Sequence, residues 1–529
     1  MLAVSAAAQG GSYRIAGTVV NAVTGEPVSG AMVALLTVED SSTVAATESG
    51  GDGHFVLARL PAAKYQLSAS KRGYCTGFYD QHDNYNSAIV TGEGQDTGNL
   101  VFRLAPEAVL SGVVSGDGGD PAAGATVMLF ERPNGHDPGA KIEQAGTTTT
   151  DDTGAYEFPD LPAGEYLLAV RAQPWYAINH FDTGLNRQPE TEQQAALDVA
   201  YPVAFFDSTS DEGSATPIVL SSGSRQQANI NLHAVQALHI EVQTPQKADG
   251  TLVQPELRQT IFGLNEGGEG GFMSRNRDGS TEFGGVAPGV YELTQGDPPR
   301  IVELNANASQ QVDPNAGTPA VAVNGTLQPA QGTAVNGAYM LSLEPAGGDA
   351  SPQPQPTFAN QRAFSFRAVP AGAWKLQVSN GLDVVSITAD GRTQRGNVLT
   401  VQDHALSVVV TVTGGRAVRI EGFARKDGKG FAGAMVVLVP KDLGAMAELS
   451  RRDQSDSDGS FGLLNVKPGE YTVVAIEDGW DLDWGNPAVI ARYLPGGQAV
   501  TVKDSLDNEP VGQPGRRVEL PEPVVVQPR

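Results

Sequence analysis

Aromatic side chains next to Asp and Asn residues occur in three segments of the sequence and could bind a ligand. Six of these rings are the candidate ligand-binding residues: Tyr79, Tyr85, Trp175, Tyr176, Trp480 and Trp484. A flat ring covers the apolar C–H face of a sugar, while neighbouring carboxylates and amides bind its hydroxyl groups. The pattern therefore indicates carbohydrate binding by surface loops. The alternative is that the rings cover a sheet edge or pack against a neighbouring domain.

Patterns that would indicate catalysis or metal binding are weak. The sequence has no GxSxG, HExxH or Walker-type motif, and its seven histidines are scattered. His82 lies within Asp80–Asp83, but three neighbouring loop residues rarely converge on one metal ion. The run Asp453–Gly459 is rich in carboxylates, yet it departs from EF-hand spacing because Gln454 stands at the first ligand position. We therefore expect no enzymatic activity, no cofactor and no bound metal ion.

The composition excludes several classes of protein. The 529 residues include 35 Lys and Arg against 60 Asp and Glu, which gives a formal net charge of −25. A chain this acidic offers no basic field to the phosphates of nucleic acids or of an anionic membrane surface. Cys75 is the only cysteine, so an intramolecular disulfide and a thiolate zinc cluster are excluded. No apolar run approaches the roughly 18–20 residues of a transmembrane segment.

A six-residue pattern, called the turn motif below, occurs five times at intervals of about a hundred residues, the size of one small β-sandwich. It consists of an apolar residue, three residues rich in Pro and Gly, one variable residue and an aromatic ring. The five copies are Leu60–Tyr65, Leu161–Tyr166, Val286–Tyr291, Val369–Trp374 and Val466–Tyr471. Alternating apolar residues precede most copies, so each copy predicts a strand, a tight turn and a return strand.

Specific residues of the turn motif have predicted roles. We expect its aromatic ring, Trp374 included, to be buried in a core. Four copies contain a Gly, which we expect to adopt the left-handed conformation of a tight turn. Asp-Gly pairs upstream, such as Asp52-Gly53 and Asp458-Gly459, predict a second turn, in which Asp binds its own backbone and Gly accepts a positive φ.

A second pattern opens the clearer repeats. A short strand that begins Gly-x-Val, or Gly-x-Ala in the last copy, is followed by a Gly/Pro-rich connection, a Gly-Ala pair and another strand. Its copies begin at Gly17, Gly112 and Gly422. Together the two patterns resemble carboxypeptidase regulatory-like domains, strongly at 13–104, 106–175 and 415–478, partly at 317–414 and weakly at 234–316. The resemblance implies a transthyretin-like β-sandwich that is non-catalytic and often exported. It supplies no catalytic residue.

These observations predict an all-β protein, a tandem array of about five Ig-like or transthyretin-like β-sandwiches joined as a semi-rigid row. The predicted segments are a signal-peptide remnant or disordered segment (1–12), sandwiches at 13–105, 106–233, 234–316, 317–414 and 415–519, and a tail (520–529). The third sandwich is degenerate and the fourth divergent. The β-branched tail could pair locally or add a strand to another molecule.

The first residues indicate export. Leu2–Gln9 resembles the end of a secretory signal, with Ala6 and Ala8 as the small residues of the cleavage site. We therefore expect an extracellular, cell-surface or periplasmic protein with a structural, adhesive or protein-binding role at the cell envelope. Its partner would be an envelope protein or a polysaccharide. The alternative function is a carbohydrate-binding array that uses the aromatic loops.

Overall fold

The computed structural model describes residues 13–133, 140–177, 195–245, 250, 252–266, 272–276, 279–330, 335, 338–347, 354–379, 382–414, 418–503 and 517–529. Below, units 1 to 5 denote the predicted segments 13–105, 106–233, 234–316, 317–414 and 415–529, the last including the expected tail. The expected secretory segment 1–12, two of the histidines (His136 and His180) and Gly415 at a predicted boundary lie outside the described residues.

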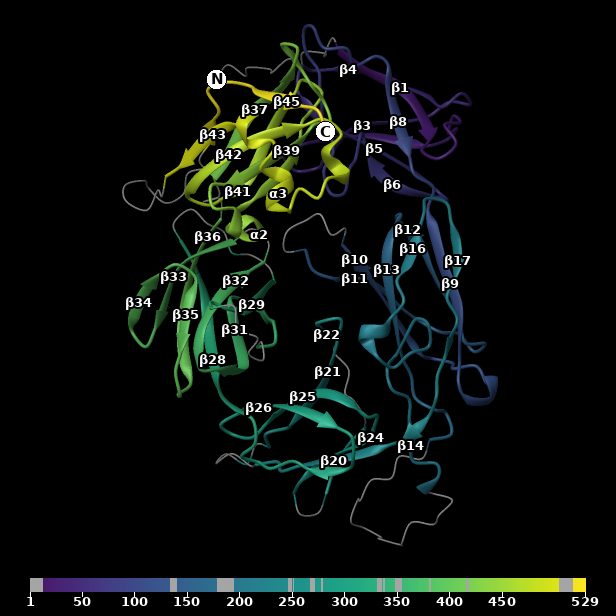
Figure 1. Ribbon diagram of the computed structural model, residues 1–529, viewed down its shortest axis with the longest axis vertical. Helices are drawn as coiled ribbons and strands as arrows, with labels where there is room; N and C mark the ends of the chain where they lie inside the picture. Colours follow the sequence, from purple (N-terminus) through teal and green to yellow (C-terminus); the bar gives the residue numbers. More distant parts are fainter. Residues whose placement is uncertain are drawn as a thin grey trace, which may run out of the picture.

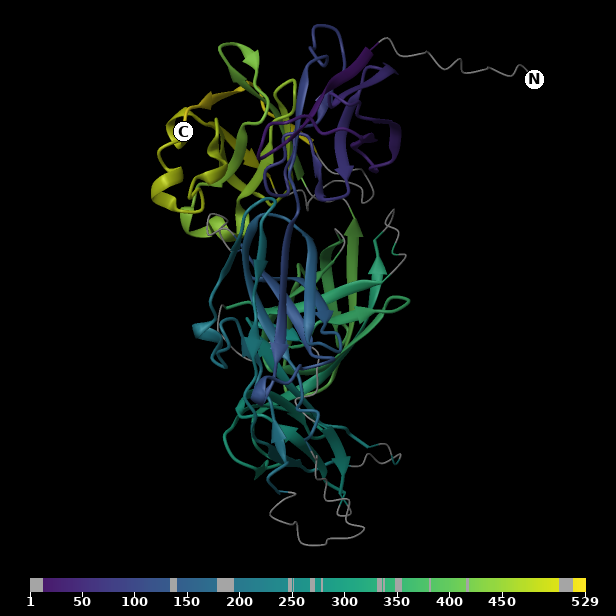
Figure 2. The same ribbon diagram turned by 90° about the vertical axis from the view of Figure 1, so that its right-hand side faces the viewer.

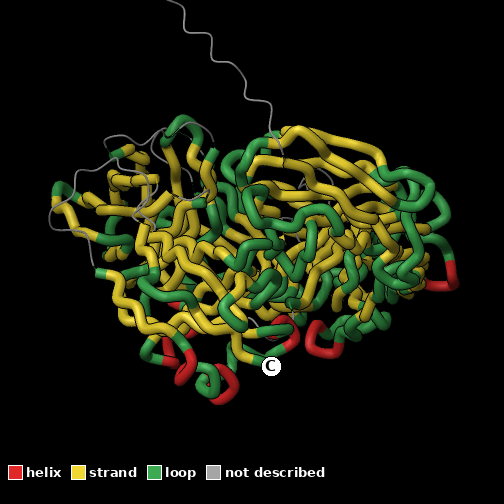
Figure 3. The backbone as a smooth tube through the Cα atoms, turned by 90° about the horizontal axis from the view of Figure 1, so that it is seen from above, coloured by secondary structure: helices red, strands yellow, loops and turns green. Residues whose placement is uncertain are grey.

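The fold is all-β, as the sequence predicts. In Figure 3, strands run through the whole body and the few helices lie at its edge. These helices are short: η1 (Asp117–Gly119), η2 (Glu212–Ser214), η3 (Leu443–Ala445), α2 (Met446–Leu449), η4 (Gly479–Asp481), α3 (Pro487–Ile490) and η5 (Leu494–Gly496). None of the helices in the described part of the chain is long and apolar enough to cross a membrane.

Units 1 and 2 each consist of two main sheets. In unit 1 the orders are β4-β1-β8 and β3-β2-β5-β6, with β7 on β5: β1 (Tyr13–Asn21), β2 (Met32–Thr37), β3 (Thr43–Glu48), β4 (His54–Leu60), β5 (Lys64–Lys71), β6 (Tyr74–Phe78), β7 (Ile89–Val90) and β8 (Leu100–Leu104). In unit 2 they are β12-β9-β17, with β18 on β9, and β11-β10-β13-β15, with β16 on β13: β9 (Ala108–Ser115), β10 (Thr126–Arg132), β11 (Glu143–Thr149), β12 (Ala155–Leu161), β13 (Gly164–Arg171), β15 (Ala204–Phe205), β16 (Ile218–Leu220), β17 (Arg225–Gln227) and β18 (Ile230–Asn231).

Units 3 and 4 share a sheet, β22-β21-β25-β26-β28-β36-β33-β34, with β31 on β28. Each also has a sheet of its own, β23-β24-β20-β27 in unit 3 and β30-β29-β32-β35 in unit 4. The strands of unit 3 are β20 (Leu238–Val242), β21 (Glu256–Ile261), β22 (Leu264–Glu266), β23 (Phe272–Arg275), β24 (Thr281–Val286), β25 (Gly289–Gln295), β26 (Arg300–Ala306) and β27 (Gln310–Gln311). Those of unit 4 are β28 (Thr318–Pro329), β29 (Tyr339–Pro345), β30 (Thr357–Ala359), β31 (Ala363–Pro370), β32 (Gly372–Val378), β33 (Leu382–Ala389), β34 (Arg392–Arg395), β35 (Val398–Val401) and β36 (Leu406–Gly414).

Unit 5 incorporates the expected C-terminal tail. Its strands have the order β38-β37-β45-β42-β39-β40, with β41 and β44 on β37 and β43 on β42: β37 (Val418–Lys426), β38 (Lys429–Gly430), β39 (Met435–Pro440), β40 (Arg451–Gln454), β41 (Ser460–Val466), β42 (Gly469–Ile476), β43 (Gln498–Val502), β44 (Arg517–Glu519) and β45 (Val524–Gln527). Strand β45 lies between β37 and β42, and Val524 and Val526 are buried. The segment expected as a tail is therefore part of the core of unit 5, because its β-branched residues complete a sheet locally.

The aromatic rings of the five turn motifs are buried in five different apolar clusters. Each ring donates a hydrogen bond to the main-chain carbonyl four residues earlier: Tyr65 to Pro61 (3.3 Å), Tyr166 to Pro162 (2.9 Å), Tyr291 to Ala287 (2.8 Å), Trp374 to Pro370 (2.9 Å) and Tyr471 to Lys467 (2.8 Å). The ring therefore fills the core while its polar atom holds the turn closed. The expected burial of the ring is confirmed, including that of Trp374.

The predicted reason for the Gly of the turn motif is wrong in three of the four copies that contain one. Gly372 has a φ of 153°, but Gly164, Gly289 and Gly469 do not have a positive φ. Instead, the aromatic ring two residues later folds back over the glycine, so that a Cβ on Gly469 would lie 3.1 Å from the Tyr471 ring. In these copies, Gly is needed for space rather than for a left-handed backbone. The upstream Asp-Gly turns follow the prediction, since Gly53 and Gly459 both have a positive φ.

The units do not form the expected row. Figures 1 and 2 show that the chain curves through units 2, 3 and 4 and returns, so that unit 5 (yellow) lies beside unit 1 (purple). Nor are neighbouring units fully separate, because Arg300 and Ile301 of β26 pair with β28 across the boundary between units 3 and 4. Local patterns predicted the sandwiches, whereas the path of the chain depends on contacts between units.

The junction between units 2 and 3 contains a histidine between two carboxylates. His239 Nδ1 lies 2.6 Å from Glu282 Oε1, and its Nε2 lies 2.7 Å from Asp198 Oδ2. These contacts raise the pKa of His239 to about 9, with the hydrogen bond to Glu282 the largest cause, although burial acts in the opposite direction. Strands β14 (Val199–Ala200) and β19 (Val235–Gln236) pair beside it. The two carboxylates therefore favour the protonated form of an imidazole at this junction.

Candidate ligand-binding cleft between units 1 and 5

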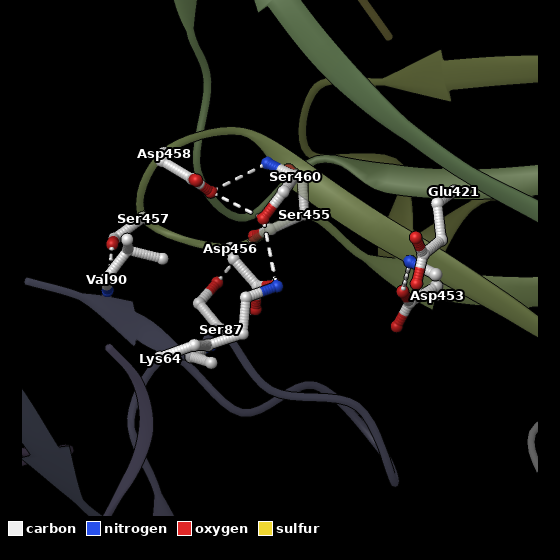
Figure 4. Close-up of polar contacts among 12 residues, drawn as sticks. Lys64, Ser87, Val90, Glu421, Asp453, Ser455, Asp456, Ser457, Asp458 and Ser460 are labelled. Carbon is white, nitrogen blue, oxygen red and sulfur yellow. Dashed lines mark hydrogen bonds and ion pairs between the residues drawn. The ribbon is translucent and has the colours of Figure 1, made fainter. Parts of the chain in front are cut away.

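The contact between units 1 and 5, called the closing interface below, joins Lys64 and residues 79–90 to residues 431–460 and 480–484. Main-chain groups form part of it. The Ala88 N–H donates to Asp456 Oδ1 at 2.7 Å, and the Ser457 N–H donates to the Ala88 carbonyl at 3.0 Å. The Val90 N–H donates to Ser457 Oγ at 2.8 Å (Figure 4). The turn before β41 therefore binds the segment that leads into β7.

Lys64 of β5 adds an ion pair to this contact. Its Nζ donates to Asp456 and, at 3.0 Å, to Ser460 Oγ (Figure 4). Asp456 is buried, and burial raises its pKa even though the charge of Lys64 acts to lower it. Lys64 is the variable residue of the first turn motif, and Asp456 belongs to the carboxylate-rich run noted in the sequence. The structure thus gives this run a role in joining two units.

Gln454 of unit 5 forms hydrogen bonds with the loop of unit 1 that contains Asp80, His82 and Ser87. Its buried side-chain Nε2 donates to Ser87 Oγ at 2.9 Å and to Asp80 Oδ2 at 3.2 Å. Its Oε1 lies 3.1 Å from His82 Nδ1. His82, considered above as a possible metal ligand, is therefore used in this contact. No group of three potential metal ligands gathers anywhere among the residues that the structure describes.

The centre of the closing interface is the guanidinium group of Arg452, whose side chain is only 4% exposed. It lies 5.0 Å from the ring centres of Tyr85 and Trp484 and 5.5 Å from that of Trp480. The His82 ring stacks on Trp480 at 4.8 Å with an interplanar angle of 7°. Cation–π contacts of this kind gain strength when they are shielded from water.

The structure thus places the six sequence-predicted ring residues in three different surroundings. Tyr85, Trp480 and Trp484 come together at the closing interface, and Tyr79 packs against Phe102 of the unit 1 core at 6.3 Å. Trp175 and Tyr176 lie elsewhere, in a T-shaped pair at 5.7 Å, and Trp175 is 79% exposed.

A cleft of about 750 Å³ opens beside the closing interface. Tyr85 and Trp484 line it, together with side chains from β5, the 84–88 loop, β37, β40 and β41. Trp484 itself is only 4% exposed. Junctions between domains are a common place for ligand sites, and this volume is within the usual range for them.

Two carboxylates in the cleft could in principle act as acid and base. Burial raises the pKa of Asp453 to about 6. Its Oδ2, however, accepts a hydrogen bond of 2.6 Å from the Gly462 N–H, and Asp456 accepts one from the Ala88 N–H. Both carboxylates thus accept hydrogen bonds from backbone N–H groups.

Sequence reasoning missed Lys64, Arg452 and the partner role of Asp456. Each has an ordinary local context, since charged residues in strands and turns usually face solvent. The sequence pointed only to the aromatic residues. Exposing a large apolar ring to water is unfavourable, and the segments that contain these rings follow the return strand in three of the repeats.

Two segments of the chain, residues 14–104 and 109–192, match the model of the carboxypeptidase regulatory-like domain. This confirms the resemblance inferred from the repeated patterns for these two segments. No curated protein matches the chain.

Three solved structures illustrate the similarity that was found. The minor pilin GBS52 of Streptococcus agalactiae is 15% identical, covering 42% of this chain and 97% of that chain, with a TM-score of 0.21. The Bacillus anthracis TIE protein is 11% identical, covering 95% and 68%, with a TM-score of 0.15. The shaft pilin SpaA of Lactobacillus rhamnosus GG is 8% identical, covering 42% and 96%, with a TM-score of 0.19. Similarity at this level supports no statement about function.

Proposed function

We propose that this chain is an exported, non-catalytic β-sandwich protein with a structural or adhesive role at the cell envelope. The observation that carries the proposal is the closing interface, in which side chains of units 1 and 5 hold distant parts of the chain together. A chain that uses buried cation–π and ion-pair contacts in this way presents its outer surfaces in a fixed arrangement. Such an arrangement suits a scaffold that holds partners at set positions.

Two further observations support this function. The family matched by units 1 and 2 implies domains without catalytic residues. The two carboxylates of the cleft, the partly buried Asp453 and the buried Asp456, accept hydrogen bonds from backbone N–H groups, which is typical of structural carboxylates.

The proposal is tested in the cells that produce the protein. Protease added to intact cells, or to cells with a permeabilised outer envelope, should digest the protein while a cytoplasmic marker survives. Purified full-length protein should then bind to the envelope fraction of the same cells. Protection of the protein together with the cytoplasmic marker would contradict export, and absence of envelope binding would contradict the adhesive role.

A second candidate function is carbohydrate binding by the exposed Trp175 and its partly buried neighbour Tyr176. The T-shaped arrangement and the 79% exposure of Trp175 favour this function, because covering a large apolar ring that is exposed to water lowers the free energy. Trp175→Ala should then abolish retention on the polysaccharide that binds the native protein. If retention is unchanged for every polysaccharide that binds, this pair is not the site.

A further inference from the structure

The cleft between units 1 and 5 holds four side-chain amides: Gln66, Asn84, Asn86 and Asn465. In the described part of the chain, none of these four side chains forms a hydrogen bond with another residue. An amide has two N–H donors and one carbonyl acceptor. The cleft therefore combines several donors and acceptors that the protein itself leaves unused.

The charged groups of the same cleft are, by contrast, already engaged. Lys64 pairs with Asp456, Arg419 with Glu421 at 2.9 Å, and Arg452 with Asp83 at 3.2 Å. The Arg451 guanidinium donates to three main-chain carbonyls, those of Glu448, Ser450 and Asn465. A charged ligand would therefore compete with contacts that the protein already makes.

From these contacts we infer that the cleft binds an uncharged, hydroxyl-rich ligand, namely a short neutral oligosaccharide. A sugar hydroxyl both donates and accepts hydrogen bonds, and amide side chains match both roles. Tyr85 lines the same cleft and is partly exposed, so it supplies aromatic surface for the apolar face of a sugar ring. The volume of about 750 Å³ is large enough for more than one ring.

This site exists only while the closing interface is intact. Unit 1 supplies Gln66, Asn84, Asn86 and Tyr85, whereas unit 5 supplies Asn465 and Trp484. The inference therefore rests on the closed arrangement used in the proposed function, and it differs from the second candidate, whose rings lie in unit 2. Ligand bound here would contact both units and so stabilise the closed form.

The test uses the full chain and a panel of neutral oligosaccharides: cellohexaose, maltohexaose, xylohexaose and chitohexaose, with oligogalacturonate as the acidic probe. Titration calorimetry should detect binding of at least one neutral probe. The double variant Asn84→Ala/Asn86→Ala should weaken that binding roughly 10- to 100-fold, since each lost neutral hydrogen bond contributes about 1 kcal/mol. Its unfolding temperature should stay unchanged, because these amides bind nothing within the described chain.

Two control variants test whether the sugar binds in this cleft. Asn315→Ala makes the same change at an exposed position of unit 3 and should leave binding unchanged. Trp175→Ala should also leave it unchanged, whereas a loss there would move the site to unit 2. The inference is overturned if no neutral probe binds, if only oligogalacturonate binds, or if the double variant binds as well as the native chain. X-ray scattering of the same samples measures whether units 1 and 5 remain in contact. The scaffold role is therefore tested separately from sugar binding.

Discussion

Replacing His239 by Gln should remove a pH dependence from the junction between units 2 and 3. In the native chain, Asp198 and Glu282 contact the two ring nitrogens and raise the pKa of His239 from 6.5 to about 9. One pKa unit corresponds to about 1.4 kcal/mol, so the charged form stabilises the folded junction by roughly 3 kcal/mol. Because the folded pKa is raised, this stabilisation is fully present below about pH 6.5 and is lost as the pH rises through about 9.

Hydrogen exchange of the β20 amides Leu238–Val242, corrected for the intrinsic effect of pH, measures the opening of this junction. For the native chain, the opening free energy should fall by about 3 kcal/mol between about pH 6 and pH 10. The variant His239→Gln should be less stable at pH 6, because two carboxylates then lack a charged partner, and it should show little further loss.

A matched control exists in unit 4. His404 also lies between two carboxylates, 3.0 Å from Asp390 and 3.4 Å from Asp403, but it is exposed to solvent. His404→Gln should therefore change stability little at any pH, since water screens exposed pairs. A flat pH profile for native β20, or an unchanged decline in His239→Gln, would refute the reasoning.

Three further predictions concern the closing interface and the turn motif. Arg452→Ala should open the contact between units 1 and 5, because Tyr85 and Asp83 of unit 1 lose their cationic partner in unit 5, a loss of roughly 2 kcal/mol or more, and X-ray scattering should report a larger radius of gyration; an unchanged radius would contradict this. Gly469→Ala should destabilise unit 5 by about 1–3 kcal/mol in denaturant unfolding, because its Cβ would press on a buried ring. Gly51→Ala, where a Cβ meets nothing, should be neutral, and equal effects of the two changes would argue against the steric explanation. Tyr166→Phe should cost about 0.5–1.5 kcal/mol by the same measurement, since it removes the hydrogen bond to the Pro162 carbonyl; a stabilised variant would exclude that role.

The candidate ring residues show how far sequence reasoning reached. Tyr85, Trp480 and Trp484 were selected as unusual loop residues, and they do gather at one place. Nothing in their local sequences indicated that they would meet, because Tyr85 belongs to the first unit and the two Trp residues to the last. Arg452, the residue that joins them, carries no local signal at all.

The sequence alone determined the all-β fold, the turn motif and the burial of its aromatic ring. Those features depend on residues within about ten positions of one another, where alternation, turn preferences and steric fit act directly. The tertiary structure alone decided that unit 5 returns to unit 1, that Lys64 meets Asp456, and that four amides from two units line one cleft. These contacts join residues almost 400 positions apart. They depend on the relative orientation of all the units between them, which no local pattern in the sequence specifies.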